Sequence, residues 1–445
     1  MTVHAVERSV SLRIAKALAG SSPPEAARHM CWRLAVDIVG LAIAARNEDY
    51  VQAVIGSTVG DGPATAFGHK RRFSLYDAAL INGVAAHGED FDDTFEGGPV
   101  HAGAVVVPAI LALAQARGLE PRATLRGIAV GAELMCRLSL VAPQAIHKAG
   151  FHPTAVIGVL AAAGGACAAL DLDETRLASA LGVAGSLASG IIEYLADGSW
   201  TKRLHAGAAA QAGLRAALLA EHGFVGPQTV LEGSHGFFKA FAPSRQPDFG
   251  PLLDGLGASW IMEQIAFKPY ACGTMTQPFV DCAIELAKAG VKAEEIDRIV
   301  CRVGEGTVHR LWEPLALKRS PPNGYAAKFS TPYCVAVGFL DGAAGLEQFT
   351  DARAADPGVR ALAANVGYEV DPDDEYPRNF TGTIIATLKD GRVLEFRKRH
   401  MRGGAREPLS DDELLAKFRA NMTFGGCSDG QIGETRDQID RLCPG

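Results

Sequence analysis

Four long segments rich in alanine, glycine and branched aliphatic residues dominate the first part of the chain. They span residues 105–116, 155–170, 175–188 and 206–221. None alternates apolar and polar side chains as a half-buried strand does, and each is long enough for three or more helical turns. Glycine makes up 50 of the 445 residues, and small side chains allow helices to approach closely. We therefore predict an all-helical domain with tight helix packing over residues 1–264.

The pattern changes after residue 265. Residues 278–289 predict a helix that ends before a glycine, and residues 296–303 predict a strand. Residues 383–396 form two apolar runs around Asp390-Gly391, a pair typical of the turn in a β-hairpin. Strands and helices therefore mix in this part of the chain.

These patterns predict a mainly α fold class with a large helical domain and a smaller α+β domain. We place the α+β domain at residues 265–400. Residues 401–445 are predicted to form a C-terminal helix that returns to the helical domain.

Composition excludes several classes of partner. Lys and Arg total 43 against 50 Asp and Glu, and this acidic balance without a basic tract argues against nucleic acid. The nine cysteines include no Cys-x-x-Cys pair, which is typical of reduced thiols and a cytoplasmic protein. Residues 151–170 have the length of a membrane span, but their alanine and glycine favour a buried helix, so we expect no membrane partner.

The densest polar cluster runs from His87 to Thr94, and His101 follows it. If the helix that includes Asn82 continues, His87, Asp90 and Thr94 lie on one face. A carboxylate beside an imidazole can set its tautomer or tune it as a proton acceptor. The cluster is therefore a candidate site for proton transfer.

An alternative interpretation concerns Asp92, Asp93 and Glu96, which fit an Asp-Asp-x-x-Glu pattern. In a helical protein this pattern suggests carboxylates that gather magnesium for a diphosphate substrate. Such a site needs a second acidic cluster, and the helical part of the sequence contains no convincing one.

Four further segments carry candidate residues. His152 stands at a glycine-bounded helix start, and Lys202 and Arg203 near another helix start suit a carboxylate or phosphate. Lys268 lies at the predicted domain junction, where ligand sites are common, and Tyr333 is a candidate phenolic acid.

Together and in order, these segments resemble the MmgE/PrpD family. The resemblance rests on Asn82–His87 leading into Asp90–Thr94, Gly150–Thr154, Lys202 with Leu204–Gly207, Lys268–Tyr270 with Cys272, and Ser330 with Pro332-Tyr333. It implies a helical domain with an α+β lid domain, a homodimer, and an active site between the domains that needs no metal. No dinucleotide-binding, Walker or His-Glu-x-x-His motif is present, and we expect no cofactor.

The resemblance also implies the site residues and their roles. The catalytic residues would be His152, His101, Asp90, Tyr333 and Lys268, and the substrate-binding residues Thr94, Lys202, Arg203, Cys272 and Gln277. A histidine would transfer the proton, Asp90 would orient an imidazole, and lysines would hold carboxylates. Gln277 stands where the family often has a histidine, and the segment between Thr94 and His101 is one residue longer than usual.

The activity implied is a metal-independent lyase that transfers a proton next to a carboxylate of a small di- or tricarboxylate. The leading version is a hydro-lyase similar to 2-methylcitrate dehydratase. A decarboxylase of the cis-aconitate type and an isomerase of the iminodisuccinate epimerase type need the same carbanion-like intermediate and remain alternatives. From another class, a noncatalytic carboxylate-binding protein would use the same residues.

Overall fold

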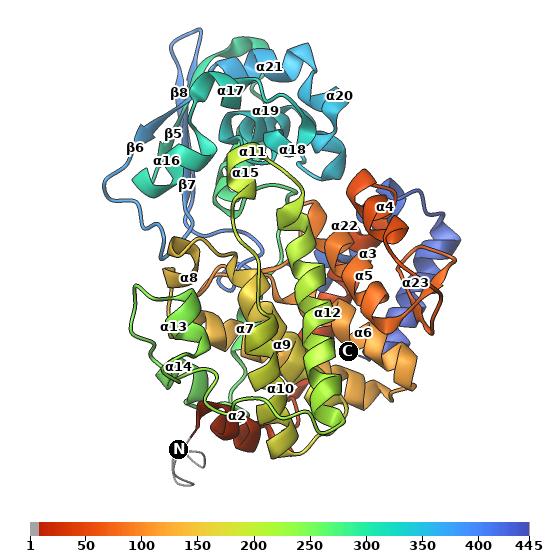
Figure 1. Ribbon diagram of the computed structural model, residues 1–445. Helices are drawn as coiled ribbons and strands as arrows, with labels where there is room; N and C mark the ends of the chain where they lie inside the picture. Colours follow the sequence, from red (N-terminus) through yellow and green to blue (C-terminus); the bar gives the residue numbers. More distant parts are fainter. Residues whose placement is uncertain (1–8, 445) are drawn as a thin grey trace. The chain divides into compact units, whose positions relative to one another are not determined.

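The chain forms two compact units in the computed structural model, which describes residues 9–444 (Figure 1). Unit 1 holds the chain up to Gly88, Asp92–Ile265 and the segment from Asp411 onward. Unit 2 holds Ala266–Ser410 together with the three residues Glu89–Phe91. The boundaries differ from the predicted ones, because unit 2 extends ten residues beyond position 400 and includes a short piece of the helical part.

Unit 1 is built almost entirely of helices, and the fold is mainly α as predicted. Its longer helices are α2 (Val10–Leu18), α3 (Glu25–Ala44), α4 (Asp49–Gly56), α5 (Leu75–Gly88), α6 (Ala102–Arg117), α7 (Pro121–Val141), α9 (Pro153–Ala169), α10 (Glu174–Leu187), α12 (Thr201–Glu221), α22 (Asp411–Phe424) and α23 (Asp429–Leu442). Its shorter elements are α8 (Ala145–Lys148), α11 (Tyr194–Asp197), α13 (Phe237–Phe241), α14 (Gly250–Leu253), η1 (Ile261–Gln264), β1 (Ala64–Thr65), β2 (Arg72–Phe73) and β3 (Thr94–Phe95).

Helix α9 is the centre of unit 1. All 17 of its residues are buried, and it packs against α6, α7, α10 and α12 (Figure 1). It is the segment whose length alone would permit a membrane span. Among residues 9–444, no helix combines the length and the hydropathy that crossing a bilayer requires.

Two glycines let α5 and α12 approach each other closely. A Cβ added at Gly83 would lie 2.6 Å from the Cα of Gly207, and one added at Gly207 would lie 2.2 Å from the carbonyl oxygen of Leu80. The tight packing predicted from the glycine content is confirmed here. The crossing bears on the site, because His87 follows Gly83 by one helical turn and His205 precedes Gly207 by two residues.

The C-terminal segment contains two helices, where the sequence predicted one. Helix α22 ends and α23 begins around Gly426, whose φ of 79° lies in the left-handed region and breaks the helix. Helix α22 packs on α3. The ammonium of Lys417 lies 2.7 Å from the carboxylate of Asp37 between these helices, and both side chains are buried.

Unit 2 contains a four-stranded sheet in the order β6-β5-β7-β8. Its strands are β5 (Ile296–Val303), β6 (Val366–Val370), β7 (Gly382–Leu388) and β8 (Val393–Lys398), and β4 (Ile265–Ala266) lies where the chain enters the unit. Strand β5 pairs in parallel with β6 and antiparallel with β7, and β7 and β8 form the hairpin predicted around Asp390-Gly391.

The helices of unit 2 connect these strands. They are η2 (Thr274–Thr276), α15 (Gln277–Lys288), η3 (Ala293–Glu295), α16 (Glu305–Leu311), α17 (Leu315–Arg319), α18 (Gly324–Ala327), α19 (Thr331–Asp341), η4 (Leu346–Phe349), α20 (Asp351–Ala354) and α21 (Pro357–Ala364). Helix α15 covers β7 and β8 and packs against α19. It ends before Gly290, as the sequence predicted.

The α5–α12 crossing generates a stability prediction. Replacing Gly207 by Ala should lower the free energy of unfolding by about 2 kcal/mol or more, because the new methyl group meets backbone atoms that cannot move aside. The matched control is Gly433→Ala in α23, where the methyl group meets nothing within 4 Å. The control should raise stability by up to about 1 kcal/mol. Urea denaturation of both variants checks this, and equal effects would contradict it.

Candidate active site

Four histidines from four different helices lie side by side in unit 1. His87 is in the last turn of α5, His101 and His152 are the residues that precede α6 and α9, and His205 lies near the start of α12. The ring of His87 lies 5.0 Å from that of His101 and 5.6 Å from that of His152, between centroids. The rings of His152 and His205 lie 5.3 Å apart. Helix ends therefore bring together imidazoles that are up to 118 residues apart in sequence.

Asp92 joins two of these imidazoles. Its carboxylate lies 2.7 Å from Nδ1 of His87, and both side chains are fully buried. The same oxygen lies 3.6 Å from Nδ1 of His101. Because a buried carboxylate needs a partner, this arrangement fixes the orientation of the His87 ring.

Backbone hydrogen bonds hold His101 in place. Its Nδ1 lies 2.6 Å from the carbonyl oxygen of Asp93, and its backbone N–H donates to Oγ1 of Thr154. The Asp93 carboxylate accepts from the N–H of Gly103 in the first turn of α6. Burial, and next the neighbouring Asp92 carboxylate, raise the pKa of Asp93 well above its usual range. Since Nδ1 of His101 faces a carbonyl oxygen, Nε2 is the ring nitrogen that can exchange a proton with a substrate.

His152 and His205 form a second pair, with 3.1 Å between their Nδ1 atoms. Burial is the largest cause that lowers the pKa of His152 well below its usual value, and the charges of His87 and Lys202 act in the same direction. The same causes lower the pKa of His205 to about 4. Both rings are therefore neutral at pH 7, and one donates its Nδ1 proton to the other.

The two basic residues at the start of α12 differ in surroundings. Lys202 lies three residues before His205 in α12, and after burial and the charge of His87 its own charge lowers the pKa of both imidazoles of the His152–His205 pair. The guanidinium of Arg203 stacks on the ring of Tyr50 at 4.2 Å from the centroid. Lys202 is thus the better suited of the two to meet a substrate carboxylate beside the histidines.

Unit 2 contains two predicted site residues, Lys268 and Asp90, which bind each other, whereas the sequence predicted that Asp90 orients an imidazole. Lys268 Nζ donates to the carbonyl oxygen of Asp90 and to its carboxylate, both at 2.9 Å. Both residues are buried. The prediction that His87, Asp90 and Thr94 share a helix face was wrong, because α5 ends at Gly88 and Asp90 has a φ of 54°. Thr94 lies in β3 instead.

The other predicted residues of unit 2 are bonded within the protein. Tyr333 is fully buried, and its hydroxyl donates to the carbonyl oxygen of Gln348 at 2.6 Å. Burial is the largest cause of a raised pKa for this phenol. The amide nitrogen of Gln277 donates to the carbonyl oxygens of Tyr270 and Cys272, so this side chain shapes the loop that follows Lys268.

The structure therefore groups the predicted residues in two sets. Unit 1 holds Thr94, His101, His152, Lys202 and Arg203, and unit 2 holds Asp90, Lys268, Cys272, Gln277 and Tyr333. The site residues implied by the resemblance did not include His87, Asp92 and His205. His87 and Asp92 nevertheless lie in the polar cluster that the sequence singled out, and His205 lies in a segment that carried the resemblance. Sequence reasoning also missed Lys328, which binds Glu89 in unit 2 and immediately precedes the segment containing Tyr333.

His87, Asp92 and His101 form a group that could hold a metal ion, because their donor atoms all lie within 4.8 Å of one another. A ligating nitrogen carries no proton. Here Nδ1 of each ring lies at hydrogen-bond distance from an oxygen, 2.7 Å for His87 and 2.6 Å for His101. Hydrogen bonds at Nδ1 leave Nε2 of each ring for a proton or a metal ion, so the expected metal independence stays a prediction. Asp92 and Asp93 likewise face protein partners, which disfavours the magnesium–diphosphate alternative.

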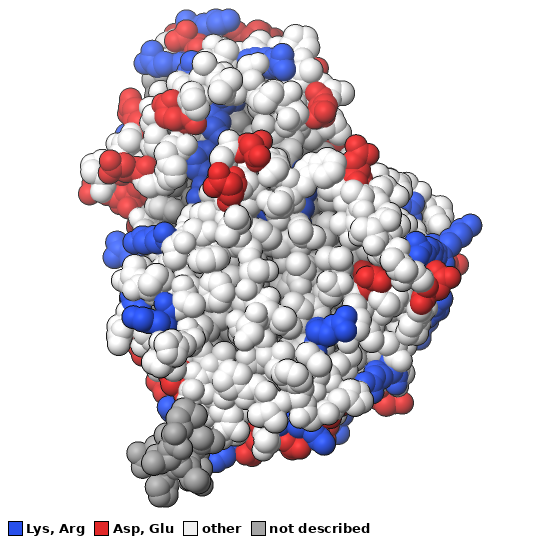
Figure 2. All heavy atoms as spheres, in the orientation of Figure 1, with Lys and Arg blue, Asp and Glu red and all other residues white. Residues whose placement is uncertain are grey.

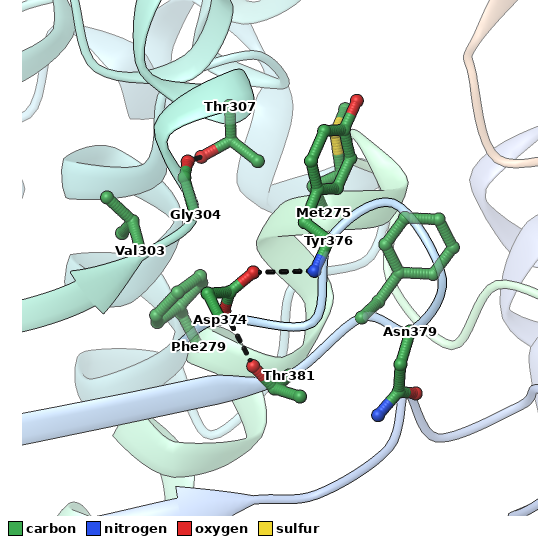
Figure 3. A pocket seen from close by; sticks show the side chains of 10 residues that line it. Met275, Phe279, Val303, Gly304, Thr307, Asp374, Tyr376, Asn379 and Thr381 are labelled. Carbon is green, nitrogen blue, oxygen red and sulfur yellow. Dashed lines mark hydrogen bonds between the residues drawn. The ribbon is translucent and has the colours of Figure 1, made fainter. Parts of the chain in front are cut away.

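Two cavities in residues 9–444 are lined by none of the predicted site residues. Figure 3 shows one in unit 2, where Asp374 accepts from the N–H of Tyr376 and from the hydroxyl of Thr381. Its volume of about 10 Å³ is that of a single water. A second cavity of about 190 Å³ lies among α3, α6 and α23 of unit 1. Neither is lined by a residue of the histidine cluster.

Comparison with known proteins identifies the class. The MmgE/PrpD N-terminal domain matches residues 13–250, and the MmgE/PrpD C-terminal domain matches residues 270–438. The chain therefore belongs to the MmgE/PrpD family, and it is an enzyme with a lyase-type function.

The relatives of this chain include cis-aconitate decarboxylases and a 2-methylcitrate dehydratase. The chain is 34% identical to a cis-aconitate decarboxylase of Mus musculus over 370 residues, which cover 79% of this chain and 72% of the relative. The Homo sapiens protein of that name is 34% identical over 360 residues, covering 78% and 72%. A 2-methylcitrate dehydratase of Cupriavidus necator is 29% identical over 234 residues, covering 48% and 46%.

The lowered histidine pKa values predict how stability depends on pH. An unfolded histidine has a pKa near 6.5 and His205 in the folded chain about 4, so the unfolded state binds the extra proton between these values. This contribution to stability is complete above pH 6.5 and is lost as the pH falls toward 4. His205→Asn should therefore reduce the drop in Tm between pH 7 and pH 5.

The control for this measurement is His222→Asn, because the His222 side chain is 79% exposed. Its pH dependence should match that of the unmodified protein. Calorimetry at closely spaced pH values measures the three Tm curves. A His205→Asn curve parallel to that of the unmodified protein would contradict the assignment of a buried neutral imidazole.

Proposed function

We propose that this enzyme decarboxylates cis-aconitate or a close tricarboxylate analogue without a metal or cofactor. The observation that carries the proposal is the cluster of four imidazoles, two of them held neutral, with Lys202 nearby. The similarity to cis-aconitate decarboxylases, which extends over 79% and 78% of this chain, supports the proposal. The hydro-lyase favoured by the sequence analysis becomes the second candidate, because the dehydratase relative matches about half of the chain.

The reaction needs one proton delivered to carbon. Loss of CO₂ from the CH₂ arm of the cis-aconitate trianion leaves an electron pair shared across three carbons. Protonation at the far carbon, next to its carboxylate, gives a five-carbon unsaturated dicarboxylate. One proton is taken up and one CO₂ is released, so charge and atoms balance. The enzyme must hold the remaining carboxylates and supply that proton from a fixed direction.

His101 is the proposed proton donor. Its Nδ1 is bonded to a carbonyl, and the Asp92 carboxylate at 3.6 Å can balance a positive charge on the ring. A doubly protonated ring presents Nε2–H to the substrate. His152, which is neutral, is proposed to bind a substrate carboxylate by a hydrogen bond. Lys202 is proposed to bind a substrate carboxylate through its positive charge. Asp90, Lys268 and Tyr333 of unit 2 stay assigned to the site through the family resemblance.

Dehydration of 2-methylcitrate is the second candidate function. It requires a base that removes a proton next to a carboxylate, and a neutral imidazole such as His152 suits that role. Return of the proton to the opposite face of the same carbon would give an epimerase. The same residues serve all three reactions, so products must distinguish them.

The location of the protein is proposed from its cysteines. All nine are free thiols, and eight of them are buried. Thiols persist in reducing compartments, which supports a cytoplasmic enzyme.

Product analysis tests the proposed activity. The enzyme is mixed with cis-aconitate in D₂O that contains EDTA, and the reaction is monitored by proton NMR. We expect release of CO₂ and a product that carries one deuterium next to a carboxylate. His152→Ala and Lys268→Ala should each lower kcat by about 10² or more, the usual scale for an acid–base or charge-holding group. The exposed His222 and Lys288 provide matched alanine controls with unchanged kcat.

Other outcomes would redirect the proposal. Water loss from 2-methylcitrate with no reaction of cis-aconitate would favour the second candidate. Deuterium exchange without any change in connectivity would favour the epimerase. Inactivation by EDTA would contradict metal independence, and near-normal kcat in both variants would contradict the site assignment.

We further propose that the enzyme is a homodimer that associates through the segment around α11. Ile191, Leu195 and Trp200 are 60%, 55% and 49% exposed. Figure 2 shows few charged side chains on the adjoining face of unit 1, where α10 and α12 lie. An apolar surface of this kind is typical of protein contacts.

Sedimentation tests the association. The unmodified protein should sediment at twice the chain mass, and Leu195→Asp should shift it toward the monomer, because a buried unpaired carboxylate opposes association. Val59→Asp is the matched control, since Val59 is 90% exposed and distant in sequence from the segment. A monomeric unmodified protein would refute the dimer.

A further inference from the structure

Two buried lysines hold consecutive residues of the segment Glu89–Phe91. Lys328, which is 1% exposed, follows α18 directly and donates from Nζ to the carbonyl oxygen of Glu89 at 2.9 Å. Its ammonium also lies 3.2 Å from the Glu89 carboxylate. Lys268 makes the equivalent pair of contacts with Asp90. All of these residues belong to unit 2.

The four charged groups neutralise one another. A buried ammonium or carboxylate is strongly destabilising when unpaired, so each lysine requires its acidic partner and each partner requires its lysine. Each ammonium binds a backbone carbonyl as well as a carboxylate, which fixes the main chain and not only the side chain. The two lysines therefore act as a clamp on Glu89 and Asp90.

The clamp holds an unfavourable backbone conformation. Asp90 has a φ of 54°, in the left-handed region that is unfavourable for a non-glycine residue. The carbonyl groups on both sides of this residue are the ones bound by the lysines. The direction of the Asp90 carboxylate thus depends on Lys328 as well as on Lys268.

Neighbouring contacts hold Lys328 itself. Its carbonyl oxygen accepts from the N–H of Gly273, in the loop that follows Lys268. Its ammonium lies 5.1 Å from the ring centroid of Phe349, and the ring of Tyr333 packs against Phe349 at 5.8 Å. Tyr333 therefore supports the clamp indirectly, through its contact with Phe349.

We infer that Lys328 is a positioning residue for the reaction, which sets the Asp90 carboxylate by holding Glu89. The inference rests on the proposed function, in which Asp90 belongs to the site. The segment Glu89–Phe91 is also the part of the chain that lies between His87 and Asp92, the hydrogen-bonded pair of the histidine cluster. Loss of the contacts between Lys328 and Glu89 would leave the backbone on the N-terminal side of Asp90 without this support.

The test uses three variants of the full chain. Lys328→Met removes the charge and keeps the length of the side chain, and Lys328→Arg restores the charge. Lys417→Met is the matched control, because Lys417 is a buried lysine paired with Asp37 in unit 1. Hydrogen exchange of the peptide that covers residues 86–94 reports the backbone of the segment. Kinetics with cis-aconitate report kcat and KM separately.

We expect Lys328→Met to raise exchange at Glu89–Phe91 by about tenfold or more. Its kcat should fall by about 10- to 100-fold, the scale of a misplaced catalytic group, with KM changed by less than about threefold. Lys328→Arg should recover most of kcat. Lys417→Met should lower Tm and leave kcat and the exchange of this segment unchanged.

Several results would overturn the inference. One is a Lys328→Met variant with unchanged kcat, and another is unchanged hydrogen exchange at Glu89–Phe91 in that variant. A third is a rise in KM alone, which would make Lys328 a substrate-binding residue. If Lys328→Met does not fold, Glu89→Gln tests the same pair from its less buried partner, whose side chain is 17% exposed, and should show the same fall in kcat. An unmodified protein with no activity on any tricarboxylate refutes the proposed function, and exchange then tests the clamp by itself.

Discussion

The hydrogen bond between His87 and Asp92 is the interaction on which the arrangement of the histidine cluster depends. Both side chains are fully buried, so neither can exchange its partner for water. The bond fixes the ring of His87, which lies between those of His101 and His152. Burial is the largest cause that lowers the pKa of His152 and His205, and the charge of His87 acts in the same direction. The buried pair therefore adds to the effect of burial, which keeps the two neighbouring imidazoles neutral.

Unit 2 uses the same principle with longer side chains. Lys268 and Lys328 each pair with one acidic residue and one carbonyl of the Glu89-Asp90 dipeptide. Buried charges are paired in both units. In unit 1 the pairing orients the imidazole of His87, and in unit 2 it orients Asp90, which the family resemblance assigns to the site. Small residues make this possible in unit 1, because Gly83 and Gly207 allow the helices that carry His87 and His205 to cross closely.

Local patterns predicted the elements well where one sequence property decides the structure. The apolar run of α9, the strand β5 and the hairpin at Asp390-Gly391 follow from hydrophobicity and turn chemistry, and all three are present. Prediction failed where tertiary contacts override local preference. The helix through His87 stops at Gly88, since Asp90 is held in a left-handed conformation by Lys268, a residue 178 positions away.

The sequence by itself determined the helical and α+β character of the two parts, and its ordered motifs determined the family. Those properties follow from periodicity, glycine content and residue identity, which are local. Only the tertiary structure decided that His205 pairs with His152, that Asp92 serves two imidazoles, and that Lys328 joins Lys268 on one short segment. These pairings depend on burial and on distances between residues far apart in the chain, and no local pattern records either.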